Sequence, residues 1–213
     1  SIELLQLYGN ELRKDEKSKH FNKIIASIDY LTTLLDDVIT IDKTESGIIS
    51  VNYEKFDLIE LINNIVLTIG TIKNSAVSMN ISSNITQLEI NSDKKLLTQI
   101  VNNLLTNAIK FSPPKSKVDV RVNSSENFFT LTVVDYGIGI PKEAQANIFV
   151  PFFRAANAQN IQGTGLGLSI AKKWADLLNG EISFESKHNK STSFTVKLPI
   201  DSEYKLAEKI ERN

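Results

Sequence analysis

The stretch DKKLLTQIVNNLLTNAIKFSPP, residues 93–114, predicts an amphipathic helix that ends at two prolines. One stripe of this helix is apolar and consists of Leu96, Ile100, Leu104 and Ala108. A second stripe is polar and consists of Gln99, Asn103, Asn107 and Lys110. At about 100° per residue, the last three of these polar residues lie within roughly 60° of one another, so their side chains share one side of the helix.

The polar stripe has two interpretations. It is either a solvated helix face or a site for a metal–phosphate group. Asparagine is a mediocre helix former, so a merely solvated face has no special need for Asn103 and Asn107. Neutral amide oxygens suit Mg²⁺ that already carries phosphate charge, and the Lys110 ammonium suits a phosphate. Taken alone, the stripe favours the solvated face.

The segments around this helix predict an α+β domain with two layers. Strands are expected at residues 51–56, 77–83, 117–122, 128–135, 181–186 and 193–199. Further helices are expected after Asp57, as a possible N-cap, and over residues 166–178, with Gly180 as the C-cap. Because no regular βαβ repeat is visible, a two-layer α/β sandwich is favoured over a parallel doubly wound sheet.

Residues 1–47 have a different pattern, with no proline and an apolar heptad seam. The seam consists of Ile24, Ile28, Leu31, Leu35 and Val38. The charged stretch RKDEKSK, residues 13–19, predicts a polar turn between two antiparallel helices, and Gly47 predicts a C-cap. The alternative is an ordinary amphipathic helix packed on its own domain. We therefore expect a helical hairpin over 1–47, a sandwich domain over 48–200 and a charged tail or linker over 201–213.

Composition excludes several classes of function. The 213 residues contain 24 Lys and Arg against 25 Asp and Glu, which leaves no broad basic face for nucleic acid. There is no cysteine, which excludes disulfides, zinc–thiolate sites and thiol nucleophiles. No apolar run approaches the roughly 20 residues that span a bilayer, so we expect a cytoplasmic chain that meets a membrane only through upstream segments of a parent protein.

Two glycine loops follow the polar helix. In VVDYGIGIP, residues 133–141, an apolar strand ends at Asp135, whose carboxylate accepts hydrogen bonds and matches the exocyclic amine of adenine. In GTGLGLS, residues 163–169, spaced glycines precede a helix and expose backbone N–H groups as a phosphate cradle. Each loop alone has an ordinary explanation, as a tight turn capped by the aspartate or as a glycine hinge.

The order of these features resembles the ATP-binding domain of sensor histidine kinases. This is the Bergerat-type fold shared with gyrase, Hsp90 and MutL. NNLLTNAIKFSP resembles the N box, DYGIGIP the first glycine box, FVPFFRA the F box and GTGLGLSIAK the second glycine box. The preceding hairpin resembles the end of the dimerisation and histidine-phosphotransfer domain, which implies a homodimeric four-helix bundle.

The resemblance implies roles for individual residues. Asn107 matches the Mg²⁺ ligand, Asn103 a neighbour that orients metal or phosphate, and Lys110 the phosphate-contacting lysine. Phe111 matches the aromatic residue beside adenine, and Asp135 the aspartate that reads the adenine amine. ATP-binding roles are also implied for Gly137, Ile138, Gly139, Ile140, Gly163, Thr164, Gly165, Leu166, Gly167 and Leu168.

The resemblance also implies a lid over residues 154–163. Phe149, Phe152 and Phe153 are expected to anchor it, although Phe149 and Phe152 are equally well explained as core residues. Arg154 is expected to reach the γ-phosphate and, with Asn103 and Lys110, to form the catalytic set.

The chain departs from the family pattern at two places. HNKSTSF, residues 188–194, replaces a Gly-x-Gly, and we expect Ser193 near adenine. The family's phosphate-accepting histidine is followed by an acidic residue, which the sequence HFNKI lacks after His20. We therefore interpret His20 and His188 as surface residues and expect the acceptor histidine upstream of Ser1.

The implied function is phosphoryl transfer from Mg·ATP to that upstream histidine and then to an aspartate of a response-regulator receiver domain. Gyrase-like ATPases place a glutamate near Asn103 to activate water, and an amide cannot take a proton, so simple hydrolysis is disfavoured. Two alternatives remain open. One is an ATPase or serine kinase of the same fold, and the other is a nucleotide-binding dimeric scaffold without kinase activity.

Overall fold

The computed structural model describes residues 1–3, 6, 13–45, 50–72 and 77–202. The chain divides into two compact units, Ser1–Ser46 and Gly47–Asn213. Most of the first arm of the expected hairpin, the expected cap at Gly47 and most of the expected tail lie outside the described residues. Among the described residues, no helix is long and apolar enough to cross a bilayer.

The first unit contains helix α2, Lys14–Glu45. The prediction of a turn over residues 13–19 was wrong, because the helix already begins at Lys14. The Glu16 carboxylate accepts the Arg13 N–H at 3.0 Å, and Asp15 and Glu16 place negative charge at the positive end of the helix dipole. Lysine, arginine and glutamate, which make up most of residues 13–19, are good helix formers, so the polarity of this stretch alone does not mark a turn.

Helix α2 exposes its apolar seam. Ile28, Leu31 and Leu35 are 57–61% exposed, and Val38 is 39% exposed. A continuous apolar stripe of this kind is suited to packing against another helix.

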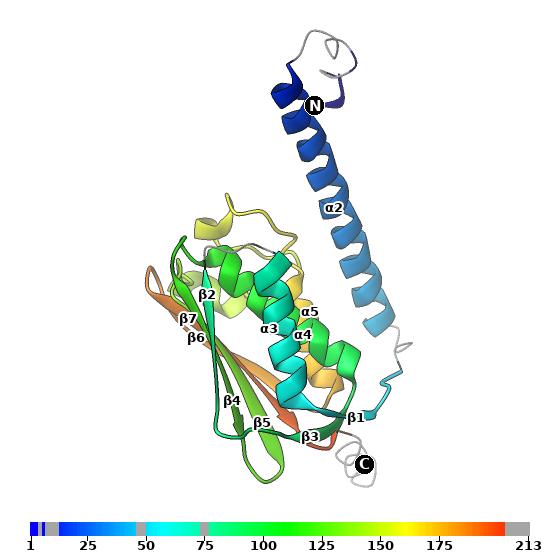
Figure 1. Ribbon diagram of the computed structural model, residues 1–213, viewed down its shortest axis with the longest axis vertical. Helices are drawn as coiled ribbons and strands as arrows, with labels where there is room; N and C mark the ends of the chain where they lie inside the picture. Colours follow the sequence, from blue (N-terminus) through cyan, green and yellow to red (C-terminus); the bar gives the residue numbers. More distant parts are fainter. Residues whose placement is uncertain (4–5, 7–12, 46–49, 73–76, 203–213) are drawn as a thin grey trace. The chain divides into compact units, whose positions relative to one another are not determined.

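The second unit is built on a five-stranded sheet (Figure 1). In order across the sheet the strands are β2 (Ser78–Ser83), β4 (Lys117–Ser124), β5 (Phe128–Asp135), β7 (Ser191–Pro199) and β6 (Glu181–Lys187). Strands β2 and β4 are parallel, and the other neighbouring pairs are antiparallel. A separate antiparallel pair joins β1 (Glu54–Asp57) and β3 (Glu89–Ser92).

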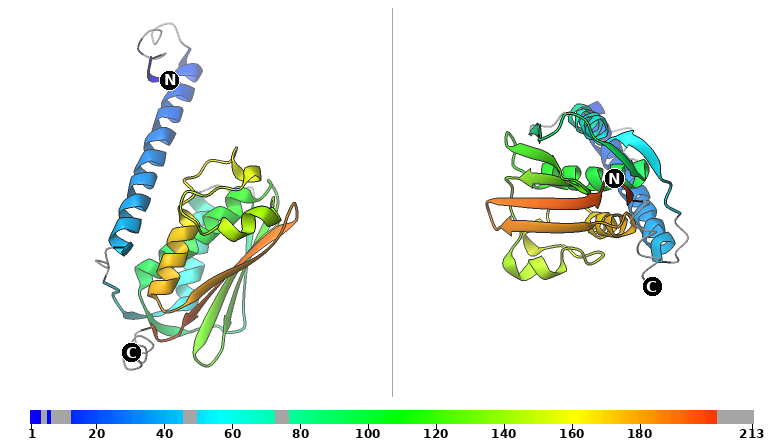
Figure 2. Two further views of the ribbon diagram at one scale, coloured as in Figure 1. Left: turned by 180° about the vertical axis from the view of Figure 1, so that it is seen from behind. Right: turned by 90° about the horizontal axis from the view of Figure 1, so that it is seen from below.

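Three helices cover one face of the sheet, which confirms the predicted two-layer α/β sandwich (Figures 1 and 2). They are α3 (Leu58–Ile72), α4 (Lys94–Phe111) and α5 (Gly167–Leu177). Two short 3₁₀ helices, η1 (Lys142–Asn147) and η2 (Ala156–Ala158), lie between β5 and α5 in the chain.

The core forms between α4 and the sheet. The predicted apolar stripe of α4 is buried, with Leu96, Ile100, Leu104 and Ala108 at most 5% exposed. The strands contribute alternate residues, because successive side chains of a strand point to opposite faces. The buried strand residues include Val118, Val120, Val122, Phe129, Leu131, Val133, Phe194, Val196 and Leu198.

The structure confirms the N-cap predicted at Asp57, adds a second N-cap at Asp93 and corrects the C-cap predicted at Gly180. Asp57 accepts the Glu60 N–H at 2.8 Å, and Asp93 accepts the Leu96 N–H at 2.9 Å, as side-chain N-caps do. At the end of α5, Asn179 rather than Gly180 adopts the left-handed conformation, with φ 58°. Gly180 N–H closes the motif on the Ala175 carbonyl, and a methyl group at Gly180 would clash with Leu198 and the Lys197 carbonyl.

We expect Gly70→Ala to raise the free energy of unfolding by about 0.5–1 kcal/mol, because alanine is the better residue inside a helix. A methyl group at Gly70 of α3 meets only the flexible end of Met79, at 3.2 Å. Urea denaturation measures this change, with Gly180→Ala as the contrasting variant that loses stability. A lower midpoint for Gly70→Ala would show that Met79 cannot move aside.

Candidate functional site

The polar stripe of α4 is half-buried and faces Gly163, which precedes α5, and Gly167, which begins it. The Asn103 Oδ1 atom lies 3.2 Å from the position of a methyl group at Gly167. The Lys110 ammonium fills the space that a methyl group at Gly163 would take. The stripe therefore faces the second glycine loop, which favours a binding surface over a simply solvated face.

Two amides of this stripe are available to a ligand. Within the described residues, the side-chain amides of Asn103 and Asn107 form no hydrogen bond, although both residues are half-buried. Lys110 also lies over the Phe111 ring, 4.6 Å from its centroid. In the described part of the chain, His, Asp and Glu form no cluster of three that could hold a metal. The other ligands of a metal at Asn107 would be water or the oxygens of a bound phosphate group.

Asp135 presents a buried carboxyl group at the end of β5. The residue is 4% exposed and accepts the Gly137 N–H at 3.0 Å and the backbone N–H of Thr192. Burial raises the pKa of the Asp135 carboxyl to about 6, and the two backbone hydrogen bonds oppose this rise. A buried acceptor with a raised pKa is suited to recognising a neutral donor such as an amine of a heterocyclic base.

The first glycine loop joins a helix end to a strand end. Ile138 N–H donates to the Phe111 carbonyl at 3.2 Å, and a methyl group at Gly137 would clash with that carbonyl. Gly139 has φ 59° and packs against the Lys187 carbonyl at the end of β6. Glycine is needed at both positions because neither contact leaves room for a side chain.

The second glycine loop opens α5. Gly165 has φ 79°, and its carbonyl accepts the Phe152 N–H at 3.1 Å. The Thr164 hydroxyl accepts the Leu166 N–H at 3.2 Å, and Leu166 is fully buried at the N-cap. The start of α5 thus carries backbone N–H groups at the positive end of the helix dipole, as an anion site requires.

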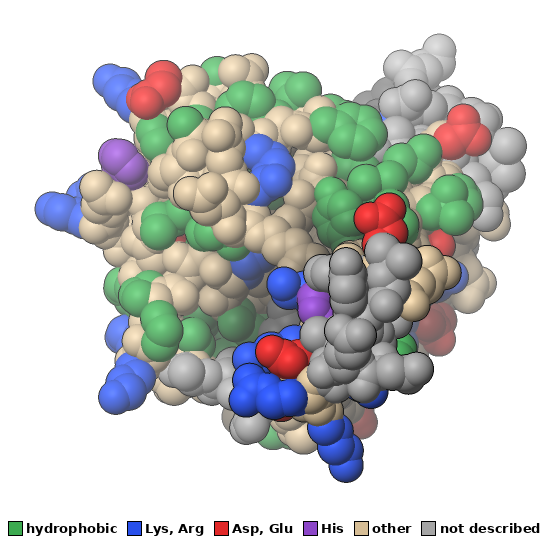
Figure 3. Space-filling view, turned by 90° about the horizontal axis from the view of Figure 1, so that it is seen from above, with side chains coloured by type: hydrophobic (Ala, Val, Ile, Leu, Met, Phe, Trp, Pro, Cys, Tyr) green, Lys and Arg blue, Asp and Glu red, His purple; other side chains and the backbone are tan. Residues whose placement is uncertain are grey.

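The phenylalanines before α5 divide into two kinds. Phe149 packs edge-to-face on Phe184 and Phe194, with ring centroids 5.9 and 6.5 Å away, as a core residue does. Phe152 is 59% exposed and has φ 64°, whereas Phe153 is half-buried. Hydrophobic side chains are visible at the surface when this end of the sandwich is viewed from above (Figure 3).

Arg154 is engaged within its own segment. Its Nη2 donates to the backbone carbonyls of Ala158, Gln159 and Ile161. This arrangement folds residues 154–161 into a compact turn, so the guanidinium organises the segment expected to be a lid.

The structure places Ser193 on the sheet face opposite Asp135. Ser193 pairs with Val134, whereas Thr192 pairs with Asp135 and is 4% exposed. The Thr192 hydroxyl lies 3.0 Å from that of Ser186. Thr192 is therefore the β7 residue beside the carboxylate, and strict alternation along residues 192–198 is the sequence signal that identifies it.

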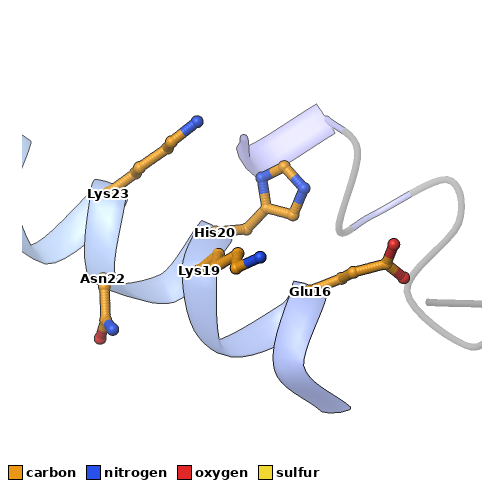
Figure 4. Close-up of a pocket in the computed structure, with 5 residues that line it drawn as sticks. All are labelled: Glu16, Lys19, His20, Asn22 and Lys23. Atoms are coloured by element: carbon orange, nitrogen blue, oxygen red, sulfur yellow. The ribbon is translucent and has the colours of Figure 1, made fainter. Parts of the chain in front are cut away.

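Neither histidine belongs to this group. His188 is exposed in the β6–β7 turn. His20 lies in the second turn of α2 beside a hollow lined by Glu16, Lys19, Asn22 and Lys23 (Figure 4). These side chains all come from one helix and point in different directions, so they do not converge on a ligand.

Comparisons with known proteins agree with this arrangement. The family described as "Histidine kinase-, DNA gyrase B-, and HSP90-like ATPase" matches residues 92–202. Sensor histidine kinase RcsC of Escherichia coli K12 is 29% identical over 198 residues, which cover 89% of this chain and 21% of RcsC. The chain thus spans about a fifth of the length of that relative.

Solved structures show the same fold. The catalytic domain of histidine kinase ThkA is 29% identical, with a TM-score of 0.63 over 71% of this chain and 98% of that domain. The structure of ThkA in complex with the response regulator protein TrrA gives a TM-score of 0.74 at 23% identity, over 94% of this chain and 56% of that chain. At this identity the second likeness concerns the fold alone.

Proposed function

Because the chain belongs to the family of histidine kinase-, DNA gyrase B- and HSP90-like ATPases, we propose that it is the catalytic core of a sensor histidine kinase in a two-component system. The observation that carries the proposal is the buried Asp135 carboxylate, at the end of β5 and next to Gly137. The acceptor lies beside Gly137, which packs on the end of α4, and in this proposal it reads an adenine amine there.

ATP binds, in this proposal, between α4 and the start of α5. Adenine meets Asp135 beside Phe111, Gly137 and Gly139, and the phosphates meet Lys110 and the N–H groups of the second glycine loop. Asn107 holds Mg²⁺ together with the phosphates. Its half-buried amide, which forms no hydrogen bond to any described residue, fits this role. The ion, when bound, neutralises phosphate charge.

The reaction is phosphoryl transfer to a histidine upstream of Ser1. An imidazole nitrogen of that histidine attacks the γ-phosphorus as the bond to the ADP oxygen breaks. Lys110 and Asn103 hold the phosphates in line, and residues 154–163 exclude water. Arg154 orders that segment through its carbonyl contacts, and in the nucleotide-bound state it reaches the γ-phosphate.

The phosphoryl group then passes to an aspartate of a response-regulator receiver domain. Support comes from histidine kinase ThkA, which shares the fold of this chain and whose structure was solved in complex with the response regulator protein TrrA. We further propose a homodimer through the exposed seam of α2, because Ile28, Leu31 and Leu35 form an apolar stripe at helical spacing.

The rival functions predict different products. An ATPase releases phosphate rapidly, and a serine kinase gives an acid-stable phosphoprotein. A nucleotide-binding scaffold binds Mg·ATP without transfer. The test is incubation of a chain extended upstream with Mg·ATP labelled at the γ-phosphate. Label that is lost in acid and kept in alkali supports phosphohistidine, and any of the other three results supports a rival.

We expect Asn107→Ala to lower the rate of phosphoryl transfer about 100-fold, because it removes the oxygen proposed to hold Mg²⁺. The measurement is the initial labelling rate over a range of Mg²⁺ concentrations. Asn102→Ala is the matched control, since Asn102 lies on the same helix but outside the stripe and is also half-buried. Equal rates for the two variants would remove Asn107 from the proposed site.

A further inference from the structure

Asn157 links the lid segment to the first glycine loop. This asparagine lies in η2, and its Nδ2 donates to the Gly139 carbonyl at 2.9 Å. The two residues are 18 positions apart in the chain, with Gly139 in the first glycine loop and Asn157 in η2. The hydrogen bond is therefore a tertiary contact and not part of a local turn.

The receiving loop is held firmly by two other side chains. The Ser186 hydroxyl of β6 accepts the Ile140 N–H at 2.8 Å. The Gln145 side chain donates to the Ile140 carbonyl at 3.0 Å. Gly139 itself rests against the Lys187 carbonyl. The carbonyl that Asn157 reaches is thus a fixed point of the loop.

The donating side is pre-organised by Arg154. The Arg154 guanidinium bonds the carbonyls of Ala158 and Gln159, which directly follow Asn157. Three side chains of the described residues form hydrogen bonds with Gly139 or Ile140, and of these only Asn157 comes from residues 154–163. Movement of this segment must therefore break the Asn157 bond, whereas the Ser186 and Gln145 bonds can persist.

We propose that Asn157 is a positioning residue that latches the lid segment onto Gly139 and slows nucleotide release. The inference rests on the proposed function, because it assumes that ATP occupies the space beside the first glycine loop. Opening of the segment frees the nucleotide, so a weaker latch raises the dissociation rate more than it changes the association rate.

The test uses two variants of this residue. Asn157→Ala removes the donor, and Asn157→Asp keeps the shape but places a carboxylate against the Gly139 carbonyl. We expect about fivefold faster dissociation for the first and a larger increase for the second, since a hydrogen bond of this kind changes an equilibrium by about that factor. The measurement is stopped-flow displacement of an N-methylanthraniloyl ATP probe with Mg²⁺ by excess ATP. Asn160→Ala is the matched control, because Asn160 is exposed in the same segment and its side chain forms no hydrogen bond within the described residues.

The outcomes separate this inference from the proposed function. If the unaltered chain does not bind the probe, the proposed function fails and the latch fails with it. If it binds and both Asn157 variants release the probe at the rate of the Asn160 variant, the latch alone is overturned. Thermal unfolding without nucleotide adds a second readout. A general loss of thermal stability in the Asn157 variants, with unchanged release, assigns Asn157 a structural role instead.

Discussion

Asp135→Asn is expected to weaken Mg·ATP binding about 100-fold and to abolish any preference for Mg·ATP over Mg·GTP. The carboxylate already accepts two backbone N–H groups, from Gly137 and Thr192, and in the proposed complex it also accepts the adenine amine. Asparagine has a single acceptor oxygen, which the backbone groups occupy, so its NH₂ group faces the donor of adenine. Loss of a charged hydrogen bond and a clash of donors together account for the expected size.

Calorimetric titration with Mg·ATP, Mg·GTP and metal-free ATP measures this effect. Asp201→Asn, which changes an exposed aspartate outside the site, is the control for altered net charge. Adenine-selective binding that disappears in Asp135→Asn supports the pocket. Equal binding of both nucleotides by the unaltered chain would mean that the glycine loops are only turns.

Asp135→Asn should also change how the free energy of unfolding depends on pH. The Asp135 pKa is about 6 in the folded chain and has an ordinary value of 3.8. Between these values the folded state keeps a proton that the unfolded state has lost, so the free energy of unfolding falls as pH rises from about 4 to about 6. This carboxyl accounts for a fall of about 3 kcal/mol, which Asp135→Asn should remove. Mg·ATP affinity should rise over the same interval, because the ionised carboxylate is the better acceptor.

The cost of the buried carboxylate indicates why this residue belongs to the site. A strand end that served packing alone would not bury an aspartate whose ionisation costs stability near neutral pH. The backbone N–H groups of Gly137 and Thr192 offset part of this cost and also fix the direction of the carboxylate. The same contacts that reduce the penalty therefore prepare the acceptor for a ligand.

The sequence predicted those parts of the fold that depend on local patterns. The periodicity of residues 93–111 identified α4 and its buried stripe, and Asp57 marked the start of α3 through its capping chemistry. The charged residues from Lys14 onward were misread as a turn, because polarity does not distinguish a turn from an exposed helix. The C-cap of α5 is Leu178, so the left-handed position that follows it falls on Asn179, and Gly180 instead leaves room for close packing on β7.

Tertiary contacts explain what the sequence did not predict about the site. Ser193 was expected near adenine, but the pairing of β5 with β7 brings Thr192 beside Asp135. The role of Asn157 has no local signal, because its partner is a backbone carbonyl 18 residues away. The seam of Ile28, Leu31 and Leu35 was visible in the sequence, and these residues are exposed in the structure. In the proposed homodimer, a second copy of the chain packs on this seam.

Gly137→Ala is expected to lower the free energy of unfolding by about 2–4 kcal/mol. The new methyl group would overlap the carbonyl of Phe111, which is backbone at the end of α4 and has no rotamer through which to move away. Relief requires the glycine loop to separate from α4, which breaks the hydrogen bond from Ile138 N–H to the same carbonyl. Loss of this bond also displaces Asp135, so nucleotide binding should weaken together with stability.

Gly163→Ala is the matched variant with the opposite pattern. Its methyl group would overlap only the Lys110 ammonium, which lies at the far end of a flexible side chain. The free energy of unfolding should therefore stay within about 0.5 kcal/mol of the unaltered chain, while Mg·ATP binding weakens because Lys110 is displaced from the proposed phosphate position. Urea denaturation and calorimetric titration of both variants measure the two effects separately. A stable Gly137→Ala chain that binds ATP normally would contradict this prediction. It would show that the first glycine loop can move away from the Phe111 carbonyl without loss of stability or of nucleotide binding.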